Sequence, residues 1–336
     1  MRVGTICFAI ERGLGHLAKS FYDNGIVTDP IVLNHGRIPE RKDWYPNAPR
    51  INVRPNSCRD TIDPILDQVD WMLFFETPFD WEMIEVCRQK GVKTALMVMH
   101  ECTLKKLPYE PDLYLCPSPL DQEYFPENSV VIPVPVEILW RQRTIAKTFV
   151  HNAGYVGLRG RNGTLELLQA MQYVMSPIEL TVRAQTNELL KIADKVPYIY
   201  EDPRVKFDIG ILPFDQVWSQ HDVAIQPEKF NGLSLPLQEA RASGMLVITT
   251  DRYPANTWLP KEPLIEVNDA TTQHISGRFL DFQEVVLEPL AIAKRIDEFY
   301  DMNITDYSLT GRDWAKTMSW NVIKPLYIDA LQKWLD

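Results

Sequence analysis

The stretch DVAIQPEKFNGLSLPLQEARASG, residues Asp222–Gly244, decides the fold. Its apolar run Val223–Ile225 has the length of a short buried strand, and a loop with Pro227 leads from it into a helical stretch that carries Glu239. A second apolar run begins after Gly244, so the stretch is one step of an alternating α/β sheet. The first turn of a helix leaves backbone N–H groups unpaired and carries a partial positive charge. We therefore expect an anion to bind where this helix begins.

Strands and helices alternate along the rest of the chain. The strands of the first half are continuously apolar, which is typical of parallel sheets covered on both faces. In the first half we predict strands at Val3–Ile10, Ile31–Asn34, Trp71–Phe75, Thr94–Met99, Leu113–Cys116 and Val130–Ile132, and helices at Ala18–Asp23, Asp60–Gln68 and Trp81–Lys90. In the second half we predict strands at Phe149–Tyr155, Glu179–Val182, Val205–Asp208, Val223–Ile225, Leu246–Thr249 and Leu264–Val267, and helices at Thr164–Val174, Thr186–Lys195, Asp215–Gln220, Leu235–Ser243 and Ala291–Asp301.

The length of 336 residues, with 45% of them apolar, suits two domains. We predict a Rossmann-like, doubly wound domain in residues 1–140 and a second one in residues 148–318. Apolar residues recur at helical spacing in Trp320–Leu335. Residues 319–336 are therefore expected to form a helix that crosses back and packs on the first domain.

Composition narrows the classes of function. The net charge of −10 disfavours broad, nonspecific nucleic-acid binding. No apolar run reaches the roughly 18 residues of a membrane span, and Met1–Gly13 resembles a strand more than a signal peptide, so we expect a cytoplasmic protein. The five cysteines are expected to be reduced thiols. Neither HxxxH nor CxxC spacing indicates a metal site.

Polar side chains follow three strands of the first predicted domain. His16, Glu76 and His100 each come after a strand, and the carboxyl ends of parallel strands share one edge of a sheet. We expect the three to converge on one crevice. Gly15 permits a close approach of the backbone to a ligand there. Ala18 stands where the GxGxxG fingerprint has its third glycine, so a nicotinamide dinucleotide is not expected.

A glycine-rich loop, Gly157–Gly163, lies between a strand and a helix of the second half. It carries Arg159 and Arg161, whose guanidinium groups can grip an anion through forked hydrogen bonds. A diphosphate is the expected ligand, and a solvated basic turn is the alternative. Arg183 follows the next strand and is expected to point into the same region.

A second basic segment lies in the first half. Arg37, Arg41, Arg50 and Arg54 are gathered there with few acidic residues nearby. One interpretation is a solvated, proline-containing loop. The other is a surface that binds an anionic acceptor.

Ordered motifs in the second half resemble those of the GT-B glycosyltransferases, most closely those of glycosyltransferase family 4. Val205–Gly210 is similar to that family's v-x-F-x-G segment, and Pro227–Glu239 to its proline–acid–Gly-Phe-Gly-Leu-Pro stretch that ends in glutamate. Ala240–Val247 is similar to the family's Ala-x-Ala-x-Gly-x-Pro-Val, and Ser319-Trp320 to its ending. The resemblance covers nearly the whole second half, is patchier in the first, and implies the GT-B fold.

The resemblance also implies roles for residues of the second half. Glu239 would bind the ribose hydroxyls of a nucleotide-sugar. Arg159 and Arg161 would hold the diphosphate leaving group. The remaining implied donor contacts are the backbone N–H groups of Gly232, Leu233 and Ser234 for the phosphates, and Ile209 and Ile211 for the base.

One position departs from the family's pattern. Asn231 stands where the family has a glutamate, eight residues before Glu239. An amide can still form a hydrogen bond with a sugar hydroxyl but carries no charge. Glu228 is a nearby substitute, although its spacing differs.

The implied activity is transfer of a hexosyl or pentosyl group from a nucleotide-sugar to an acceptor hydroxyl in an interdomain cleft. The resemblance implies retention of configuration without a metal or a further cofactor, with His16, His100 or Glu76 orienting the acceptor. The acceptor class stays open among glycan, protein, small molecule and modified DNA. One alternative is a phage-type enzyme that acts on a hydroxymethylated base of DNA in the host cytoplasm. Another is a catalytically silent nucleotide-sugar binding protein.

Overall fold

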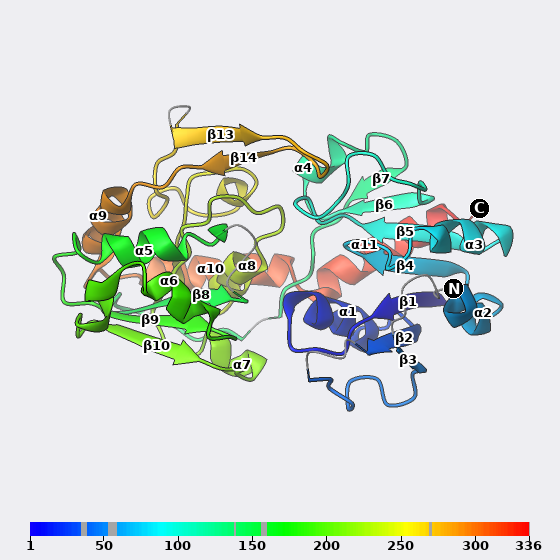
Figure 1. The fold of residues 1–336 in the computed structure, drawn as a ribbon, viewed down its shortest axis with the longest axis horizontal. Helices are drawn as coiled ribbons and strands as arrows, with labels where there is room; N and C mark the ends of the chain where they lie inside the picture. Colours follow the sequence, from blue (N-terminus) through cyan, green and yellow to red (C-terminus); the bar gives the residue numbers. More distant parts are fainter. Residues whose placement is uncertain (35–38, 53–58, 138, 156–159, 269–270, 336) are drawn as a thin grey trace. The chain divides into compact units, whose positions relative to one another are not determined.

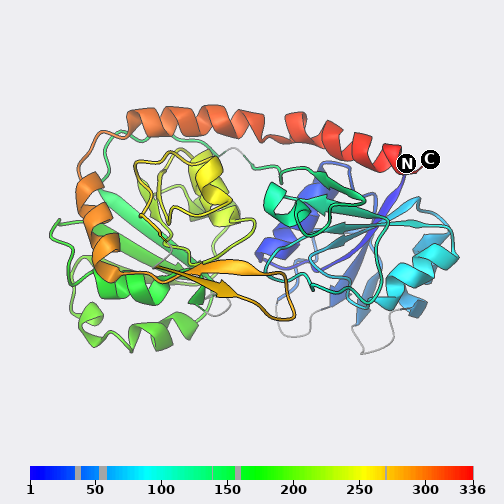
Figure 2. The ribbon, with the colours of Figure 1, turned by 90° about the horizontal axis from the view of Figure 1, so that it is seen from above.

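The computed structural model describes residues 1–34, 39–52, 59–137, 139–155, 160–268 and 271–335. They form two compact α/β units (Figures 1 and 2). Unit 1 consists of Met1–Pro135, Ser276–Leu280 and Trp320–Asp336, and unit 2 consists of Val136–Ile275 and Asp281–Ser319. The chain therefore returns to unit 1 twice after leaving it. Within the described ranges, none of the helices combines the length and the apolar character that crossing a bilayer requires.

Unit 1 is built on a seven-stranded parallel sheet in the order β3-β2-β1-β4-β5-β6-β7. Buried apolar side chains of the central strands form its core, and β4 is buried at every position. The strands are β1 (Val3–Cys7), β2 (Asp29–Asn34), β3 (Arg50–Asn52), β4 (Trp71–Phe75), β5 (Lys93–Met97), β6 (Leu113–Cys116) and β7 (Ser129–Val131). The helices are α1 (Gly13–Asp23), α2 (Arg59–Leu66), α3 (Glu82–Gln89), α4 (Pro119–Gln122) and α11 (Trp320–Lys333).

Unit 2 is built on a five-stranded parallel sheet in the order β10-β9-β8-β11-β12. Its strands are β8 (Thr148–Gly154), β9 (Glu179–Ala184), β10 (Val205–Ile209), β11 (Val223–Ile225) and β12 (Leu246–Ile248). Its helices are α5 (Thr164–Ala170), α6 (Glu188–Ala193), η2 (Pro197–Tyr200), α7 (Phe214–Val217), α8 (Leu235–Ala242), η3 (Ala255–Thr257), α9 (Pro289–Phe299) and α10 (Thr305–Thr317). Unit 2 also contains an antiparallel hairpin of β13 (Thr272–Ile275) and β14 (Phe282–Val285). The prediction of two doubly wound parallel sheets is confirmed.

The terminal helix α11 completes the core of unit 1. Phe21 of α1 packs edge-on against the rings of Trp320 and Tyr327, with centroids 5.0 and 4.9 Å away. The indole N–H of Trp320 donates to the Ser20 hydroxyl at 2.8 Å, and the buried Tyr327 hydroxyl donates to the Pro133 carbonyl at 3.3 Å. Buried aromatic rings with satisfied polar ends contribute strongly to a core. The last helix is thus an integral part of the first unit.

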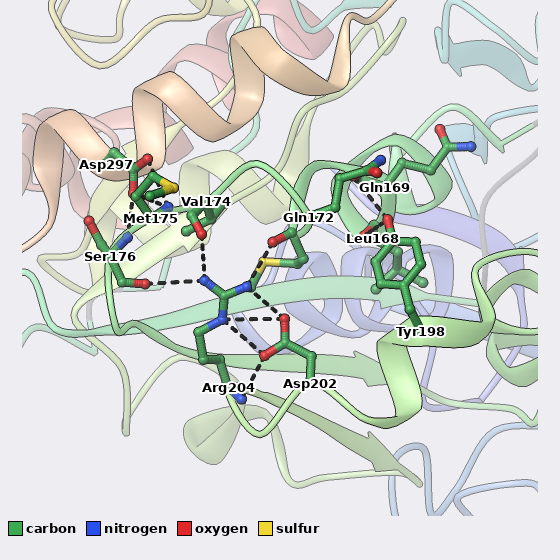
Figure 3. Close-up of polar contacts among 11 residues, drawn as sticks. Leu168, Gln169, Gln172, Val174, Met175, Ser176, Tyr198, Asp202, Arg204 and Asp297 are labelled. Atoms are coloured by element: carbon green, nitrogen blue, oxygen red, sulfur yellow. Dashed lines mark hydrogen bonds and ion pairs between the residues drawn. The ribbon is translucent and has the colours of Figure 1, made fainter.

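Arg204 fixes the chain that follows α5 in unit 2 (Figure 3). Its guanidinium donates to the carbonyl oxygens of Met171 and Val174 at 2.7 and 2.6 Å and forms an ion pair with Asp202 at 2.7 Å. The Asp297 carboxylate of α9 accepts the backbone N–H groups that follow Val174, at 2.9 to 3.1 Å. The end of a helix leaves carbonyl groups unpaired, and the Arg204 guanidinium supplies donors for them. The Asp297 carboxylate instead accepts from the N–H groups of Met175 and Ser176. These contacts fix the segment that leads from α5 into β9.

The structure differs from the predicted elements at several places. The predicted strand Leu264–Val267 is wrong, because only a single bridge joins Ile265 to Thr250. The helix after β1 begins at Gly13 and not at Ala18. Several elements were not predicted from the sequence: β3, α4, η2, η3, α10 and the β13–β14 hairpin.

Candidate functional site

A buried ion pair fixes the loop that leads from β11 into α8. The Glu228 carboxylate accepts from Arg252 at 2.6 Å, and their side chains are 3% and 8% exposed. The Ser234 hydroxyl donates to the same carboxylate at 2.8 Å, and the Asn231 amide donates to its other oxygen at 3.2 Å. Burying a charge is costly unless it is paired in this way. Glu228 therefore faces Arg252 inside the protein, which corrects the expectation that it substitutes for the missing family glutamate.

Asn231 shapes the N-terminus of α8. Its side-chain oxygen accepts the backbone N–H of Ser234 at 3.0 Å, and Ser234 adopts the left-handed conformation with φ of 53°. The Ser234 N–H, expected from the sequence to bind a phosphate, is thus already bonded within the loop. Asn231 acts here as a cap of the turn before α8, as short polar side chains commonly do.

The glycine-rich loop before α5 packs directly on the loop after β11. The backbone N–H of Lys229 donates to the Arg161 carbonyl at 2.7 Å, and the Lys229 ammonium pairs with Glu166 of α5. Gly163 has φ of +66°, and a Cβ at this position would lie 2.1 Å from the Pro227 carbonyl oxygen. Arg161 and the start of α8 therefore lie on neighbouring loops at the carboxyl end of the sheet. Arg159 falls outside the described residues.

Glu239 lies in the second turn of α8 and is only partly exposed. The indole N–H of Trp218 donates to its carboxylate at 3.0 Å. Burial raises the pKa of Glu239 to about 7; the Trp218 hydrogen bond opposes this rise and the Glu137 charge adds to it. Buried Arg143 donates to the Trp218 carbonyl at 2.6 Å and so positions the indole. The Trp218 indole therefore holds this carboxylate, whose oxygens can accept further hydrogen bonds.

Other predicted donor residues lie at the ends of β9 and β10. Arg183 is buried in β9, where Asp208 pairs with it at 2.8 Å and the Val217 carbonyl accepts from it. These contacts tie β9 to β10 and to the end of α7. Ile209 ends β10 and is partly buried, whereas Ile211 is 51% exposed. The exposed Ile211 side chain can offer apolar surface to a ligand.

In unit 1, His16, Glu76 and His100 follow β1, β4 and β5, which are neighbours in the sheet. Glu76 adopts a left-handed conformation with φ of 69°, which is costly for a residue other than glycine and recurs at functional sites. His100 is buried, and its Nδ1 lies 3.2 Å from the Asp121 carboxylate at the start of α4. The strand ends thus adjoin as predicted, although each histidine has its own acidic partner.

Glu11 links His16 to the basic segment. The His16 Nε2 lies 2.8 Å from the Glu11 carboxylate, which also pairs with Arg41. Arg41 pairs with Asp43 as well, and Arg50 pairs with Glu40 at 2.7 Å. These ion pairs neutralise the two arginines locally. Arg37 and Arg54 fall outside the described residues.

Gly15 has a packing role that the sequence did not indicate. It lies inside α1 and is buried, and a Cβ there would be 2.1 Å from the Ile10 carbonyl oxygen. The space left by the missing side chain of Gly15 is occupied by the Ile10 carbonyl group of the protein itself. The approach of a ligand to the Gly15 backbone stays a prediction.

The described cysteines, Cys7, Cys87, Cys102 and Cys116, are free thiols, and burial raises the pKa of Cys7 to about 12. Cys58 falls outside the described residues. In the part of the chain that the structure describes, no group of three or more His, Cys, Asp or Glu residues is arranged to hold a metal ion.

Four residues that the sequence did not single out contact the predicted site residues or Glu228 in the structure: Glu11, Asp121, Trp218 and Arg252. Asp121 could have been predicted from the sequence, because Ser118-x-x-Asp121 resembles a capping box at the start of a helix. The structure shows the two reciprocal hydrogen bonds of that motif. Arg252 and Trp218 carry no local signal, since each pairs with a residue about twenty positions away.

No protein-family model and no curated protein sequence matches the chain. Solved structures do match it. A glycosyltransferase from Rickettsia africae has 12% identity and a TM-score of 0.70, covering 100% of this chain and 98% of its own. Anabaena HepE, in complex with UDP and glucose, has 11% identity and a TM-score of 0.70, covering 99% and 100%. Sucrose-phosphate synthase from Thermosynechococcus elongatus has 14% identity and a TM-score of 0.67, covering 99% and 97%. The chain therefore has the GT-B fold.

Proposed function

We propose that this protein is a glycosyltransferase that moves a sugar from a nucleotide-sugar to an acceptor hydroxyl. The observation that carries the proposal is the junction of two loops at the carboxyl end of the unit 2 sheet. There the Lys229 N–H binds the Arg161 carbonyl, and α8 presents Glu239 one turn beyond its start. Similar structures include complexes of HepE with UDP and with UDP-glucose, which supports a uridine diphosphate sugar as the donor.

The chemistry follows from charge. As the bond between the anomeric carbon and the diphosphate breaks, positive charge develops on the sugar and negative charge on the leaving group. Arg161 and the partial positive charge of the α8 N-terminus would stabilise the leaving group. Glu239 would hold the ribose hydroxyls. These groups can act without a metal ion.

We propose retention of configuration at the anomeric carbon. The acceptor oxygen would form its bond on the face that the diphosphate leaves, and a diphosphate oxygen would take the acceptor's proton. His16, Glu76 and His100 are the unit 1 candidates for orienting that acceptor. Arg41 and Arg50 each form an ion pair with a nearby carboxylate, so they do not support the alternative of DNA as the acceptor.

The test is thermal denaturation with a panel of nucleotide-sugars, because a ligand at about 100 times its dissociation constant adds roughly 2.7 kcal/mol of stability. The nucleotide-sugar that stabilises the protein is then assayed for hydrolysis. We expect the Arg161→Ala variant to lose about 10²- to 10³-fold in kcat, as removal of a group that stabilises transition-state charge does. The matched control is Arg295→Ala, whose partly exposed side chain pairs with exposed Glu298 on α9.

Two outcomes would contradict the proposal. Absence of stabilisation by every nucleotide-sugar would exclude donor binding. Stabilisation without release of sugar, even with acceptors present, would leave the silent binding protein as the function.

A further inference from the structure

A hollow of about 490 Å³ lies in unit 2, between the C-terminal half of α8, the chain after η3 and the first turns of α10. These two helices lie side by side, because Gly311 of α10 packs on the Arg241 carbonyl of α8. The volume falls in the range of about 300–1,000 Å³ that is typical of small-molecule sites. None of its lining residues belongs to the set assigned to donor binding above.

One wall of the hollow is apolar and rigid. It is formed by Trp258, Leu259 and Pro260. Trp314 stacks on Trp258 with centroids 5.1 Å apart, and the Arg241 guanidinium lies 4.6 Å from the Trp314 ring. A preformed aromatic wall binds a ligand with little loss of side-chain freedom.

The other walls of the hollow carry both hydrogen-bond acceptors and hydrogen-bond donors. Glu262 and Asp306 are exposed carboxylates, and Thr310 and Tyr307 contribute hydroxyl groups. Arg241 supplies a guanidinium whose Nη1 is buried with no hydrogen-bond partner among the described residues. The hollow can therefore both accept and donate hydrogen bonds around an apolar wall.

This combination selects against two ligand classes. The two exposed carboxylates outnumber the single, partly buried guanidinium, so the lining has a net negative charge that repels an anion. A wholly apolar ligand would remove these charged groups from water without giving them partners. A neutral polyhydroxylated ligand avoids both the repulsion and the loss of hydrogen bonds. Its hydroxyl groups can donate to the carboxylates and accept from Arg241, and its C–H faces can lie against the Trp258 ring.

We propose that this hollow binds a neutral oligosaccharide. The site is separate from the donor residues, so it goes beyond the transfer reaction proposed above and does not depend on it. It would retain the protein on a carbohydrate while the other residues act.

The experiment uses the full chain on an array of neutral and sialylated oligosaccharides, followed by calorimetric titration with the neutral oligosaccharide that binds most strongly. The test variant is the double substitution Glu262→Gln and Asp306→Asn, which removes two exposed charges and keeps the side-chain shapes. The matched control is Asp313→Asn, an exposed carboxylate of the same helix that pairs with Arg312 and Lys316 and does not line the hollow. Thermal denaturation checks that all three proteins are folded.

We expect the wild-type chain to bind a neutral oligosaccharide, the double variant to bind it at least tenfold more weakly, and Asp313→Asn to match the wild type. The proposal is overturned if no neutral oligosaccharide binds, if only sialylated ones bind, or if the double variant binds as the wild type does. Stabilisation by nucleotide-sugars is measured on the same proteins. If it is absent while the oligosaccharide result holds, the proposed transfer function fails and this site stands.

Discussion

Trp218 donates its indole N–H to the Glu239 carboxylate across 3.0 Å, which joins the end of α7 to the second turn of α8. The indole is 1% exposed, so the carboxylate meets a largely apolar surface with one hydrogen-bond donor. That surrounding explains the raised pKa, because burial disfavours the charged form more than the single hydrogen bond favours it. Glu239 is consequently a titratable group near neutral pH.

The first prediction concerns stability. Between the ordinary value of 4.5 and the folded pKa of about 7, the native protein binds more protons at Glu239 than the unfolded chain does. The free energy of unfolding therefore falls as pH rises through this window. Glu239→Gln removes the effect and should be more stable than the wild type above pH 7, by at most about 3 kcal/mol. Urea denaturation across the pH range measures it, and Glu298→Gln, an exposed carboxylate, should follow the wild type.

The second prediction concerns ligand binding. An ionised Glu239 accepts hydrogen bonds from ribose hydroxyls, whereas a protonated one has less capacity to accept. The affinity for uridine diphosphate should therefore rise with pH through about 7 and then level off. Calorimetric titration at several pH values checks this. A pH-independent affinity in the wild type, or an unchanged pH profile in Glu239→Gln, would contradict the assigned role.

The third prediction compares two glycines of one loop. Gly163 and Gly160 have φ of +66° and +69°, so alanine is strained at both, by about 1–2 kcal/mol. Only at Gly163 would the new Cβ also collide with the Pro227 carbonyl, while nothing lies within 4 Å at Gly160. Gly163→Ala should cost about 1–3 kcal/mol more than Gly160→Ala in denaturation, because overpacking displaces backbone. Equal losses would show that the two loops are not in contact.

The fourth prediction tests the buried ion pair. Arg252→Met leaves the Glu228 carboxylate buried without its cation and should destabilise the protein by about 3–5 kcal/mol. Adding Glu228→Gln to that variant should recover part of the loss, since no uncompensated charge remains. Lys206→Met breaks an exposed pair with Glu179 and should change stability by less than about 1 kcal/mol. A loss no larger than that of Lys206→Met would refute the structural role of Arg252.

The alternating sheets were predictable because the apolar runs of β4, β6 and β11 are continuous. Helix α10 was not, because its sequence is polar and contains Gly311. That glycine is required by close packing on the Arg241 carbonyl, a contact seventy positions apart that no local pattern encodes.

In the candidate site, too, some features were predictable from the sequence and others were not. Glu239 was indicated by the resemblance of Pro227–Glu239 to a family motif, which is a local pattern of residues. The buried pairing of Glu228 with Arg252, which the Asn231 amide joins, was not predictable, because Arg252 lies 24 positions further along the chain. Pairings of this kind arise from the folded arrangement of distant segments.

The position of α11 has a consequence for biosynthesis. Phe21 belongs to α1, but the rings that cover it, Trp320 and Tyr327, belong to α11, which follows every other described helix and strand along the chain. Part of the unit 1 core therefore stays open until α11 has been synthesised, although domains usually fold in the order of their synthesis. The unit that emerges first is completed last.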